Sequence, residues 1–273
     1  MSGLLYIVAT PIGNLEDISF RAVRVLREAD RIACEDTRQT RKLLDHYGIA
    51  KPTVSYHEHN EQARSEELIR DLEQGLNIAM VSDAGTPLIA DPGYRVVEKA
   101  RERGIQVVPI PGPSALVTAL SASGLPTDRF AFLGFLPPKS GQRRKALQEA
   151  RALGITAIFY ETPHRIVEAL SDIAEVYGPS RVVLGRELTK LHEEFLSGTA
   201  AALHEQLEAR SSVKGEFTVI VSPAEPEIDE SVPVEQEVAA LIASGVARMD
   251  ALKQVARRRG LSKREVYKTL NDQ

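Results

Sequence analysis

The sequence predicts an α/β protein with two lobes, a parallel sheet in the first and a mixed sheet in the second, plus a small helical domain. Short β-rich runs alternate with helical patterns over residues 1–123, and this alternation predicts βαβ units. Three prolines within 125–138 break that pattern before a second group of strands. An acidic, proline-rich segment then precedes three short helical patterns. These observations divide the chain into four regions.

The first lobe, residues 1–123, is expected to hold five buried parallel strands. One stretch between strands places Val25, Leu26 and Ala29 on one face, which predicts an amphipathic helix. Asp17 is expected to be its N-cap. Ligands of such sheets bind at the carboxyl ends of the strands. The predicted strands read LLYIVAT, RIACE, TVSYH, IAMVSD and QVVPI.

The second lobe, residues 124–222, is expected to have a different topology. Three of its strands follow one another with only one substantial helix between them, which predicts a mixed or antiparallel sheet. The predicted strands read AFLGFL, TAIFYE, RVVLGREL, EEFLSGT and EFTVIVS.

Residues 223–232 have the composition of an exposed linker, and residues 233–273 are expected to form a helical domain. Gly245 and Gly260 separate three helical patterns, and Ser262 is placed to cap the last one. This spacing is that of a helix-turn-helix, but any small three-helix bundle would produce it as well.

Composition narrows the classes further. The content of 43% hydrophobic and 26% charged residues is typical of a globular protein. With Cys34 as the single cysteine, the chain has no internal disulfide, which fits a reducing compartment. The first residues lack the features of a signal peptide, and no apolar run approaches the length of a membrane span. We therefore expect a cytoplasmic protein without a membrane partner.

Charge is distributed unevenly along the C-terminal part of the chain. Residues 223–237 carry six acids and no bases, whereas residues 245–268 carry eight bases and two acids. A basic helical segment of this kind is a plausible electrostatic footprint for nucleic acid. A solvated helix surface is an equally good interpretation of the charge alone.

Common nucleotide-binding motifs are missing from the chain. No GxGxxG follows a strand, and the segment GFLPPKS has Pro138 where a P-loop needs its second glycine. These absences disfavour dinucleotide and nucleoside triphosphate sites. The lack of a glycine-rich first loop also disfavours a Rossmann-type methyltransferase.

Two loops that follow predicted strands are the best candidates for binding a small molecule. Residues 81–93 read VSDAGTPLIADPG, and residues 109–115 read PIPGPSA. Glycine lets a ligand approach the main chain, and proline fixes the path of the loop. Both loops could instead be tight connections between a strand and a helix.

Several separated blocks together resemble the tetrapyrrole methylase superfamily, and more narrowly its ribosomal RNA branch. The blocks are TPIGNLEDISFRA, EDTR, SDAGTPLIADPG, IPGPSA, ETPHR and GRELTKLHEE, and the match spans nearly the whole chain. The resemblance implies that the protein is a homodimer. It also implies that the two lobes of the chain form a cleft, with S-adenosylmethionine bound between them. It also implies methylation of the 2′-hydroxyl of a cytidine in 16S ribosomal RNA of the small subunit.

The resemblance further implies which residues contact the cofactor. Many members of the superfamily have Gly-Asp-Pro after the fourth strand, whereas this chain has Thr86 in the middle position, as the RNA branch does. The missing acid weakens the transfer to tetrapyrrole substrates. The cofactor-binding candidates are Asp83, Gly85, Thr86, Pro87, Ile89, Ser114, Ala115 and Tyr160.

The implied reaction is an in-line displacement, in which most of the catalysis can come from alignment of the reactants. A general base would assist, because a hydroxyl is a poor nucleophile until its proton leaves. The candidates are Glu35 and Asp36 after the second strand, with Lys190 and Glu193 in the second lobe. The alternatives are that Asp36 or Thr37 caps the next helix, and that Lys190 and Glu193 form cross-strand ion pairs.

Basic side chains in several places are predicted to contact RNA phosphates, which positions the substrate without specifying its sequence. The alternative is that they are ordinary exposed helix charges. They are Arg38, Arg143, Arg144 and Arg165, together with Arg257, Arg258, Lys263 and Arg264 in the tail. No metal is expected, because His57 and His59 have no evident third ligand.

Two other functions compete with RNA methylation. A tetrapyrrole C-methyltransferase would need a large pocket with arginines but no basic tail. A ligand-sensing regulator would bind duplex DNA through the C-terminal helices and show no turnover with RNA.

Overall fold

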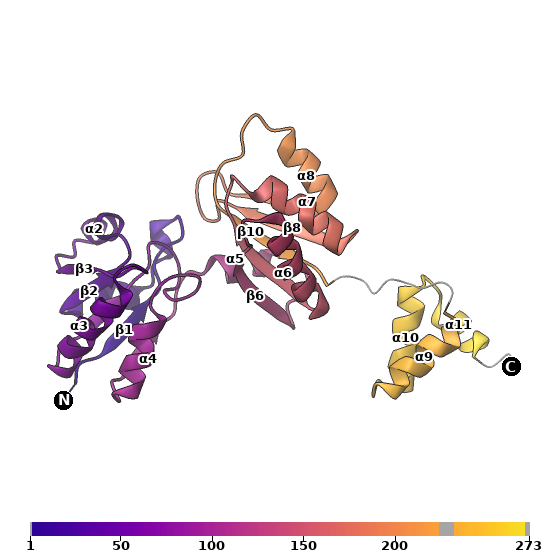
Figure 1. The fold of residues 1–273 in the computed structure, drawn as a ribbon, viewed down its shortest axis with the longest axis horizontal. Coiled ribbons are helices and arrows are strands. Elements are labelled where there is room, and N and C mark those ends of the chain that lie inside the picture. Colours follow the sequence, from indigo (N-terminus) through magenta and orange to yellow (C-terminus); the bar gives the residue numbers. More distant parts are fainter. Residues whose placement is uncertain (1, 224–231, 271–273) are drawn as a thin grey trace. The chain divides into compact units, whose positions relative to one another are not determined.

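The chain forms two compact units, Met1–Pro223 and Ala224–Gln273, and each is described by itself. The computed structural model describes residues 2–223 and 232–270, without the side chains of Arg257 and Arg258. Most of the predicted linker, 224–231, therefore lies outside the described residues. Figure 1 labels most of the helices and strands on a ribbon whose colour runs from indigo at the N-terminus to yellow at the C-terminus.

The first lobe contains a sheet of five parallel strands, as the sequence predicts. The strand order is β3-β2-β4-β1-β5. Because β4, β1 and β5 are neighbours, the loops that follow them meet at one edge of the sheet. The strands are β1 (Leu5–Val8), β2 (Arg31–Cys34), β3 (Thr53–Ser55), β4 (Ile78–Met80) and β5 (Val107–Ile110).

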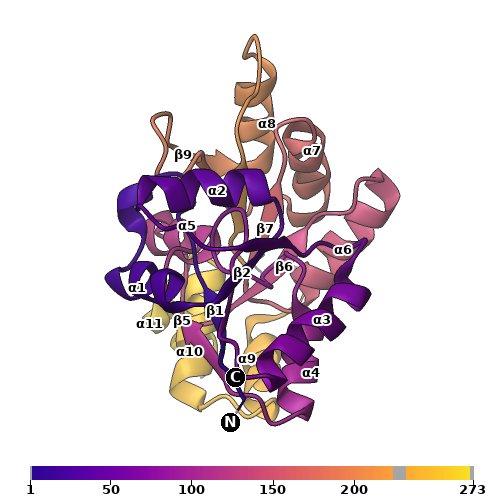
Figure 2. The ribbon, with the colours of Figure 1, turned by 90° about the vertical axis from the view of Figure 1, so that its left-hand side faces the viewer.

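Helices cover both faces of this sheet. One core joins Val25, Leu26 and Leu44 to the strands, and the other joins Leu68 and Val96 to them. Apolar side chains at helical spacing thus bury each helix against the strands. Figure 2 shows α1 on one side of the sheet and α3 and α4 on the other. The helices are α1 (Phe20–Glu28), α2 (Thr37–His46), α3 (Glu61–Glu73) and α4 (Tyr94–Glu102).

The N-terminus of α1 differs from the prediction. The hydroxyl of Ser19 accepts the N–H of Ala22 at 3.1 Å, so Ser19 is the N-cap. Asp17 instead ends a short 3₁₀ turn, Leu15–Asp17. The prediction of Asp17 as the cap is wrong because this extra turn shifts the start of the helix.

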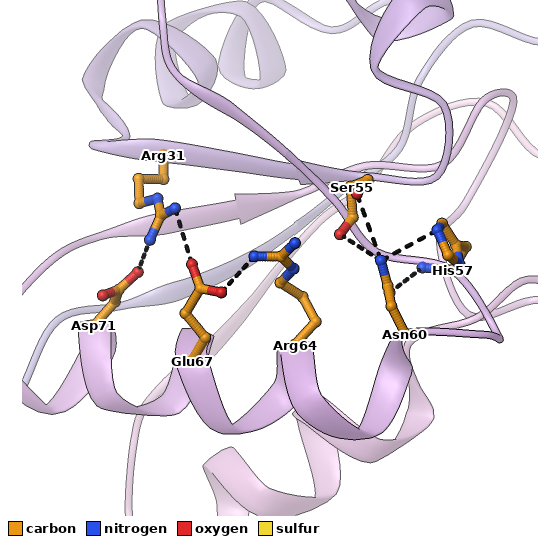
Figure 3. Close-up of polar contacts among 7 residues, drawn as sticks. All are labelled: Arg31, Ser55, His57, Asn60, Arg64, Glu67 and Asp71. Carbon is orange, nitrogen blue, oxygen red and sulfur yellow. Dashed lines mark hydrogen bonds and ion pairs between the residues drawn. The ribbon is translucent and has the colours of Figure 1, made fainter.

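Polar contacts fix α3 to the sheet (Figure 3). The guanidinium of Arg31 in β2 pairs with Asp71 and, at 3.1 Å, with Glu67 of α3. Before the helix, the Asn60 amide donates to the Ser55 carbonyl at 3.1 Å and accepts the His57 N–H at 2.9 Å. These contacts set the position of α3 relative to β2 and β3.

The second lobe contains a mixed sheet, which confirms the predicted change of topology. The strand order is β6-β7-β10-β8-β9, with β6 and β7 parallel and the other neighbours antiparallel. The elements are β6 (Phe130–Phe135), α6 (Ser140–Ala152), β7 (Thr156–Glu161), α7 (Ile166–Tyr177), β8 (Arg181–Arg186), β9 (Glu194–Thr199), α8 (Ala200–Glu208) and β10 (Phe217–Val221).

Helix α5 (Ala115–Ser123) connects the two lobes. Its Ala119 and Leu120 share a core with Ile158, Val183 and Ile220 of the second sheet. Figure 1 shows α5 beside β10 and β8. The predicted boundary at residue 123 assigns this helix to the first lobe, whereas its apolar face packs on the second.

The C-terminal unit packs three helices around a small apolar core that includes Val238, Leu252, Val255 and Val266. The helices are α9 (Val234–Ala243), α10 (Arg248–Arg258) and α11 (Lys263–Thr269). The predicted Ser262 cap is confirmed: its hydroxyl accepts the Glu265 N–H, and Glu265 accepts the Ser262 N–H at 2.6 Å. Within the described residues, no helix is long and apolar enough to cross a membrane.

Candidate active site

Hydrogen bonds join the loops that follow β1, β4 and β5. Thr10 and Gly85 exchange backbone N–H···O bonds of 2.9 and 3.0 Å. The Thr86 hydroxyl donates to the Pro113 carbonyl at 3.2 Å. The result is a continuous edge of backbone and small side chains at the carboxyl ends of three neighbouring strands.

A cavity of about 280 Å³ lies over this edge. Both lobes line it, which agrees with the rule that α/β sheets bind ligands at the carboxyl ends of their strands. The first lobe contributes Ile12, Asp83, Ala84, Gly85, Thr86, Ile89, Ala90, Asp91, Ser114 and Ala115. The second contributes Phe135, Tyr160, Glu161, Thr162, Pro163, Gly185, Leu188, Lys190, Glu216, Phe217 and Thr218.

Seven of the eight residues predicted to contact the cofactor line this cavity. Pro87, the eighth, is buried beside it and is not among the lining residues. Tyr160 reaches across from the second lobe, and its hydroxyl accepts the N–H of Leu116 in the first turn of α5 at 3.2 Å. The phenol therefore holds the start of α5 in place.

Lys190 is the one predicted catalytic residue that lines the cavity. Its ammonium donates to Glu187 and to Glu216, each at 2.8 Å. Burial lowers the pKa of Lys190, but the hydrogen bonds to the two carboxylates outweigh burial and raise it. A lysine that stays protonated cannot accept a proton. Lys190 is therefore better suited to hold the two carboxylates at the cavity wall than to act as a general base.

Gly13 provides the space that Lys190 occupies. A Cβ placed on Gly13 would lie 2.3 Å from the Lys190 Cγ and 3.0 Å from the Leu188 carbonyl oxygen. The neighbouring Asn14 N–H donates to the Thr189 hydroxyl at 3.1 Å. The loop after β1 thus packs tightly against the loop after β8.

Asp36 lies after β2, outside the cavity lining. It is the N-cap of α2, and its carboxylate accepts the Arg38 N–H at 2.8 Å and pairs with the guanidinium at 2.9 Å. Hydrogen bonds from the Arg38 side chain and backbone lower the pKa of Asp36 to about 2. These contacts match the capping interpretation and make Asp36 a weak base.

Glu35 and Glu193 also lie outside the lining of the main cavity. Glu35 lines a smaller hollow behind it, and burial, with Asp83 and Glu58 nearby, raises the pKa of Glu35. Glu193 is exposed, and its carboxylate accepts the Thr189 N–H at 2.6 Å. Glu193 therefore stabilises the turn that carries Thr189.

Arg143 is buried, whereas its charge predicts an exposed position. It is 1% exposed, and its Nε donates to the Asp172 carboxylate at 2.6 Å. A second nitrogen donates to the Pro138 carbonyl at 3.3 Å. The prediction that Arg143 contacts RNA is therefore corrected: its guanidinium is satisfied inside the protein and holds α6 on α7.

The other predicted RNA-contacting residues have more accessible positions. The side chain of Arg38 is 88% exposed, and that of Arg144 is 41% exposed. Arg165 is partly buried and pairs with Glu161 at 2.7 Å. In the tail, Lys263 and Arg264 are exposed, whereas the side chains of Arg257 and Arg258 lie outside the described residues.

The His57 ring lies 5.9 Å from the His59 ring. The Nε2 of His57 is 3.1 Å from the Asn60 amide nitrogen (Figure 3). In the part of the chain that the structure describes, no group of three or more His, Cys, Asp or Glu residues could hold a metal ion.

Sequence reasoning missed most of the second-lobe wall and Asp91 of the first lobe. Asp91 belongs to the loop SDAGTPLIADPG, which the sequence indicates as a candidate ligand-binding loop, so the position of Asp91 in this loop was the available signal. Phe135, Leu188 and Phe217 lie at or just beyond strand ends of the second sheet. Their meeting depends on how the lobes face each other, which no local pattern reveals.

The two-lobed α/β fold of this chain is also found in solved structures. A diphthine synthase covers 81% of this chain and 90% of its own, with a TM-score of 0.64 at 16% identity. A uroporphyrin-III-C-methyltransferase from Thermus thermophilus covers 81% of this chain and 95% of its own, with a TM-score of 0.57 at 20% identity. At these identities the likeness concerns the fold alone.

The family model described as Tetrapyrrole (Corrin/Porphyrin) Methylases matches residues 4–204. Curated relatives named Ribosomal RNA small subunit methyltransferase I align over nearly the full length. The relative from Halalkalibacterium halodurans is 53% identical over 97% of this chain and 93% of its own. The relative from Escherichia coli O157:H7 is 48% identical over 97% of this chain and 94% of its own. The chain belongs to the tetrapyrrole methylase family, within the group that these relatives form.

Proposed function

We propose that this protein transfers a methyl group from S-adenosylmethionine to the 2′-hydroxyl of a cytidine in small-subunit ribosomal RNA. The proposal rests mainly on the relative from Halalkalibacterium halodurans, which is 53% identical over 97% of this chain, C-terminal helices included. The names of these relatives favour RNA over a tetrapyrrole or duplex DNA as the substrate.

The residues around the cavity fit the cofactor. Ser114 gives no side-chain hydrogen bond to the first turn of α5, where the Tyr160 hydroxyl accepts the Leu116 N–H. Other N–H groups at a helix N-terminus can bind carboxylates and other anions. Gly85 has a φ of 81° and brings bare backbone to the cavity edge. Ile89 and Leu188 supply apolar wall. The volume is close to the lower end of about 300 Å³ for small-molecule pockets.

When bound, S-adenosylmethionine supplies an electrophilic methyl group. The loops after β4 and β5 would hold it through Gly85, Thr86, Ser114 and Ala115, with Tyr160 as a wall. Holding reactants in line contributes much of the rate enhancement in such displacements. The ammonium of Lys190, paired with Glu187 and Glu216, would hold these two carboxylates in place at the wall of the cavity.

We further propose that the protein works as a homodimer in the cytoplasm. Large apolar side chains are exposed in the first unit, among them Phe20, Tyr94 and Val117, which are 99%, 66% and 55% exposed. Exposed apolar surface of this kind is typical of faces that another chain covers.

The decisive experiment is methyl transfer from labelled S-adenosylmethionine to purified small subunits that lack the modification. We expect label in 2′-O-methylcytidine, identified by mass spectrometry of the digested RNA. Subunits that already carry the modification are the matched control and should take up no label. Cofactor binding without transfer to RNA would contradict the proposal.

The basic tail is expected to contribute affinity for RNA. Lys263 and Arg264 in α11 are exposed, and removing one phosphate-binding cation reduces the slope of the salt dependence of binding by about one. A Lys263→Glu, Arg264→Glu variant should therefore bind RNA more weakly, with a salt slope smaller by about two. Binding titrations over a range of salt concentrations measure both changes.

The matched control for the tail variant is Arg70→Glu. Arg70 is an exposed arginine in the last turn of α3, and the next residue, Asp71, pairs with Arg31 at the start of β2. Arg70 is not among the residues that line the cavity. This variant should keep the affinity and the salt slope. Equal losses in both variants would contradict a specific role of the tail.

A further inference from the structure

Asp91 forms part of the wall between the cavity and the smaller hollow behind it. It lines both spaces, whereas Glu35, Tyr56 and Ser82 line only the hollow. The contacts proposed above for the cofactor do not use this carboxylate. Asp91 is thus a partly buried acid at the reaction cavity that has no assigned role.

The loop that carries Asp91 is held in a strained conformation. Leu88 and Ala90, just before it, have φ values of 72° and 64°. Residues other than glycine rarely adopt such angles, and they persist where the surrounding structure imposes them, often at functional sites. The backbone before Asp91 is therefore fixed at a cost in free energy.

A contact from another helix holds the far end of this loop. The Glu61 carboxylate of α3 accepts the Gly93 N–H at 3.3 Å and the Tyr56 hydroxyl at 3.1 Å. Its other oxygen pairs with Arg95 at 3.3 Å. Asp91 thus lies between two fixed points, which keeps its position constant before substrate binds.

The groups around Asp91 favour its protonated form. Burial, and then the charge of Glu35, raise the pKa of Asp91 to about 6, although a hydrogen bond with Ser82 opposes the shift. Asp83 acts in the same direction as Glu35, and Tyr160 faces Asp91 from the second lobe. A carboxylate of this kind is a stronger base than an exposed one and is still ionised at neutral pH.

We propose that Asp91 is the base that accepts the proton of the attacking hydroxyl, an assignment that rests on the proposed function. The hydroxyl oxygen forms a bond to the methyl carbon, and the carbon–sulfur bond breaks with its electron pair going to sulfur. The hydroxyl proton passes to the Asp91 carboxylate and later to water. Asp36, with its pKa of about 2, and the protonated Lys190 are less suited to this step.

The test compares Asp91→Asn with the wild type. General-base catalysis contributes about 100-fold or more, so the single-turnover rate should fall by at least about that factor. The affinity for S-adenosylmethionine, measured by calorimetry, should stay within about threefold, because the proposed cofactor contacts remain. The acid limb near pH 6 in the wild-type profile of kcat/KM should disappear in the variant.

Thermal stability supplies a readout that is independent of turnover. Because the folded-state pKa of Asp91 is raised, its protonated form stabilises the fold at low pH, and this contribution is lost as the pH rises through about 6. Asp91→Asn should therefore have a higher Tm than the wild type at about pH 8 and an equal Tm at about pH 4. A purely structural carboxylate would lower the Tm on substitution.

Asp45→Asn is the matched control, because Asp45 is an exposed carboxylate in the last turns of α2. It should keep the wild-type rate and pH profile. The assignment is overturned if Asp91→Asn keeps its rate and acid limb, or if Asp36→Asn loses them instead. A wild-type protein that methylates no RNA would refute the proposed function, whereas an active wild type with an active Asp91→Asn would refute the Asp91 assignment alone.

Discussion

Replacing Arg143 with alanine is expected to lower the free energy of unfolding by about 3 kcal/mol, because it leaves a charged partner buried without its counterion. Asp172 is 7% exposed and accepts the Arg143 Nε at 2.6 Å. Its remaining contacts are the Ser140 hydroxyl at 2.9 Å and the more distant Arg144 at 3.8 Å. Denaturant titration, followed by circular dichroism, measures the loss.

Arg144→Ala is the matched control for this prediction. Arg144 is the next residue of α6, and its guanidinium pairs with Glu175 at 2.7 Å on an exposed surface. Exposed ion pairs contribute about 0–1 kcal/mol, so this variant should remain nearly as stable as the wild type. Equal losses in the two variants would contradict the assignment of Arg143 to the interior.

A double variant separates the charge from the packing. In Arg143→Met, Asp172→Leu, both charges are replaced by apolar side chains of similar size. Replacing a whole buried ion pair in this way is often neutral or stabilising. We therefore expect the double variant to recover most of the stability that Arg143→Ala loses. Continued instability would indicate that the contact with the Pro138 carbonyl, and not the pair, is the important one.

Arg143 also shows why charge alone was a poor guide to this surface. Arg143, Leu147 and Ala150 are all buried in α6, at the spacing of one helix face. Arg144 is one residue away, about 100° around the helix, and it faces solvent. The apolar residues at positions 147 and 150 were the signal in the sequence, and weighing them against charge would have placed Arg143 inside.

Much of the fold could be predicted because strands and helices alternate with clear periods. The first sheet, the mixed second sheet and the three C-terminal helices all follow from local patterns. The position of α5 could not be predicted in this way. Its core partners Ile158, Val183 and Ile220 come from three separate strands, so only the assembled lobe brings them together.

The candidate site, too, could be predicted only in part from local sequence patterns. The first-lobe edge could be predicted from the loops after β4 and β5, since parallel strands bring their carboxyl ends to one edge. Lys190 reaches the cavity because Gly13 leaves room for it and Glu187 and Glu216 hold its ammonium. The roles of Asp36 and Asp91 depend on burial and on neighbouring charges, which a linear pattern does not contain.

Gly85→Ala is expected to weaken binding of S-adenosylmethionine by about tenfold or more, since misplaced backbone near a bound group is costly. Gly85 has a φ of 81°, a conformation that costs an L-residue about 1–2 kcal/mol. Its added Cβ would lie 3.3 Å from the Ile12 Cγ2, on the edge of the cavity. Relief of this strain would disturb the paired hydrogen bonds between Gly85 and Thr10.

Gly154→Ala provides the control, because it has the same kind of backbone strain without the cavity. Gly154 follows α6, has a φ of 63°, and would place its Cβ in open space. Both variants should lose about 1–2 kcal/mol of stability in denaturant titrations, but only Gly85→Ala should lose cofactor affinity in calorimetry. If both variants bind the cofactor as the wild type does, the backbone at Gly85 is not part of the cofactor site. If both bind equally weakly, the loss reflects stability, and the proposed contact at Gly85 fails as well.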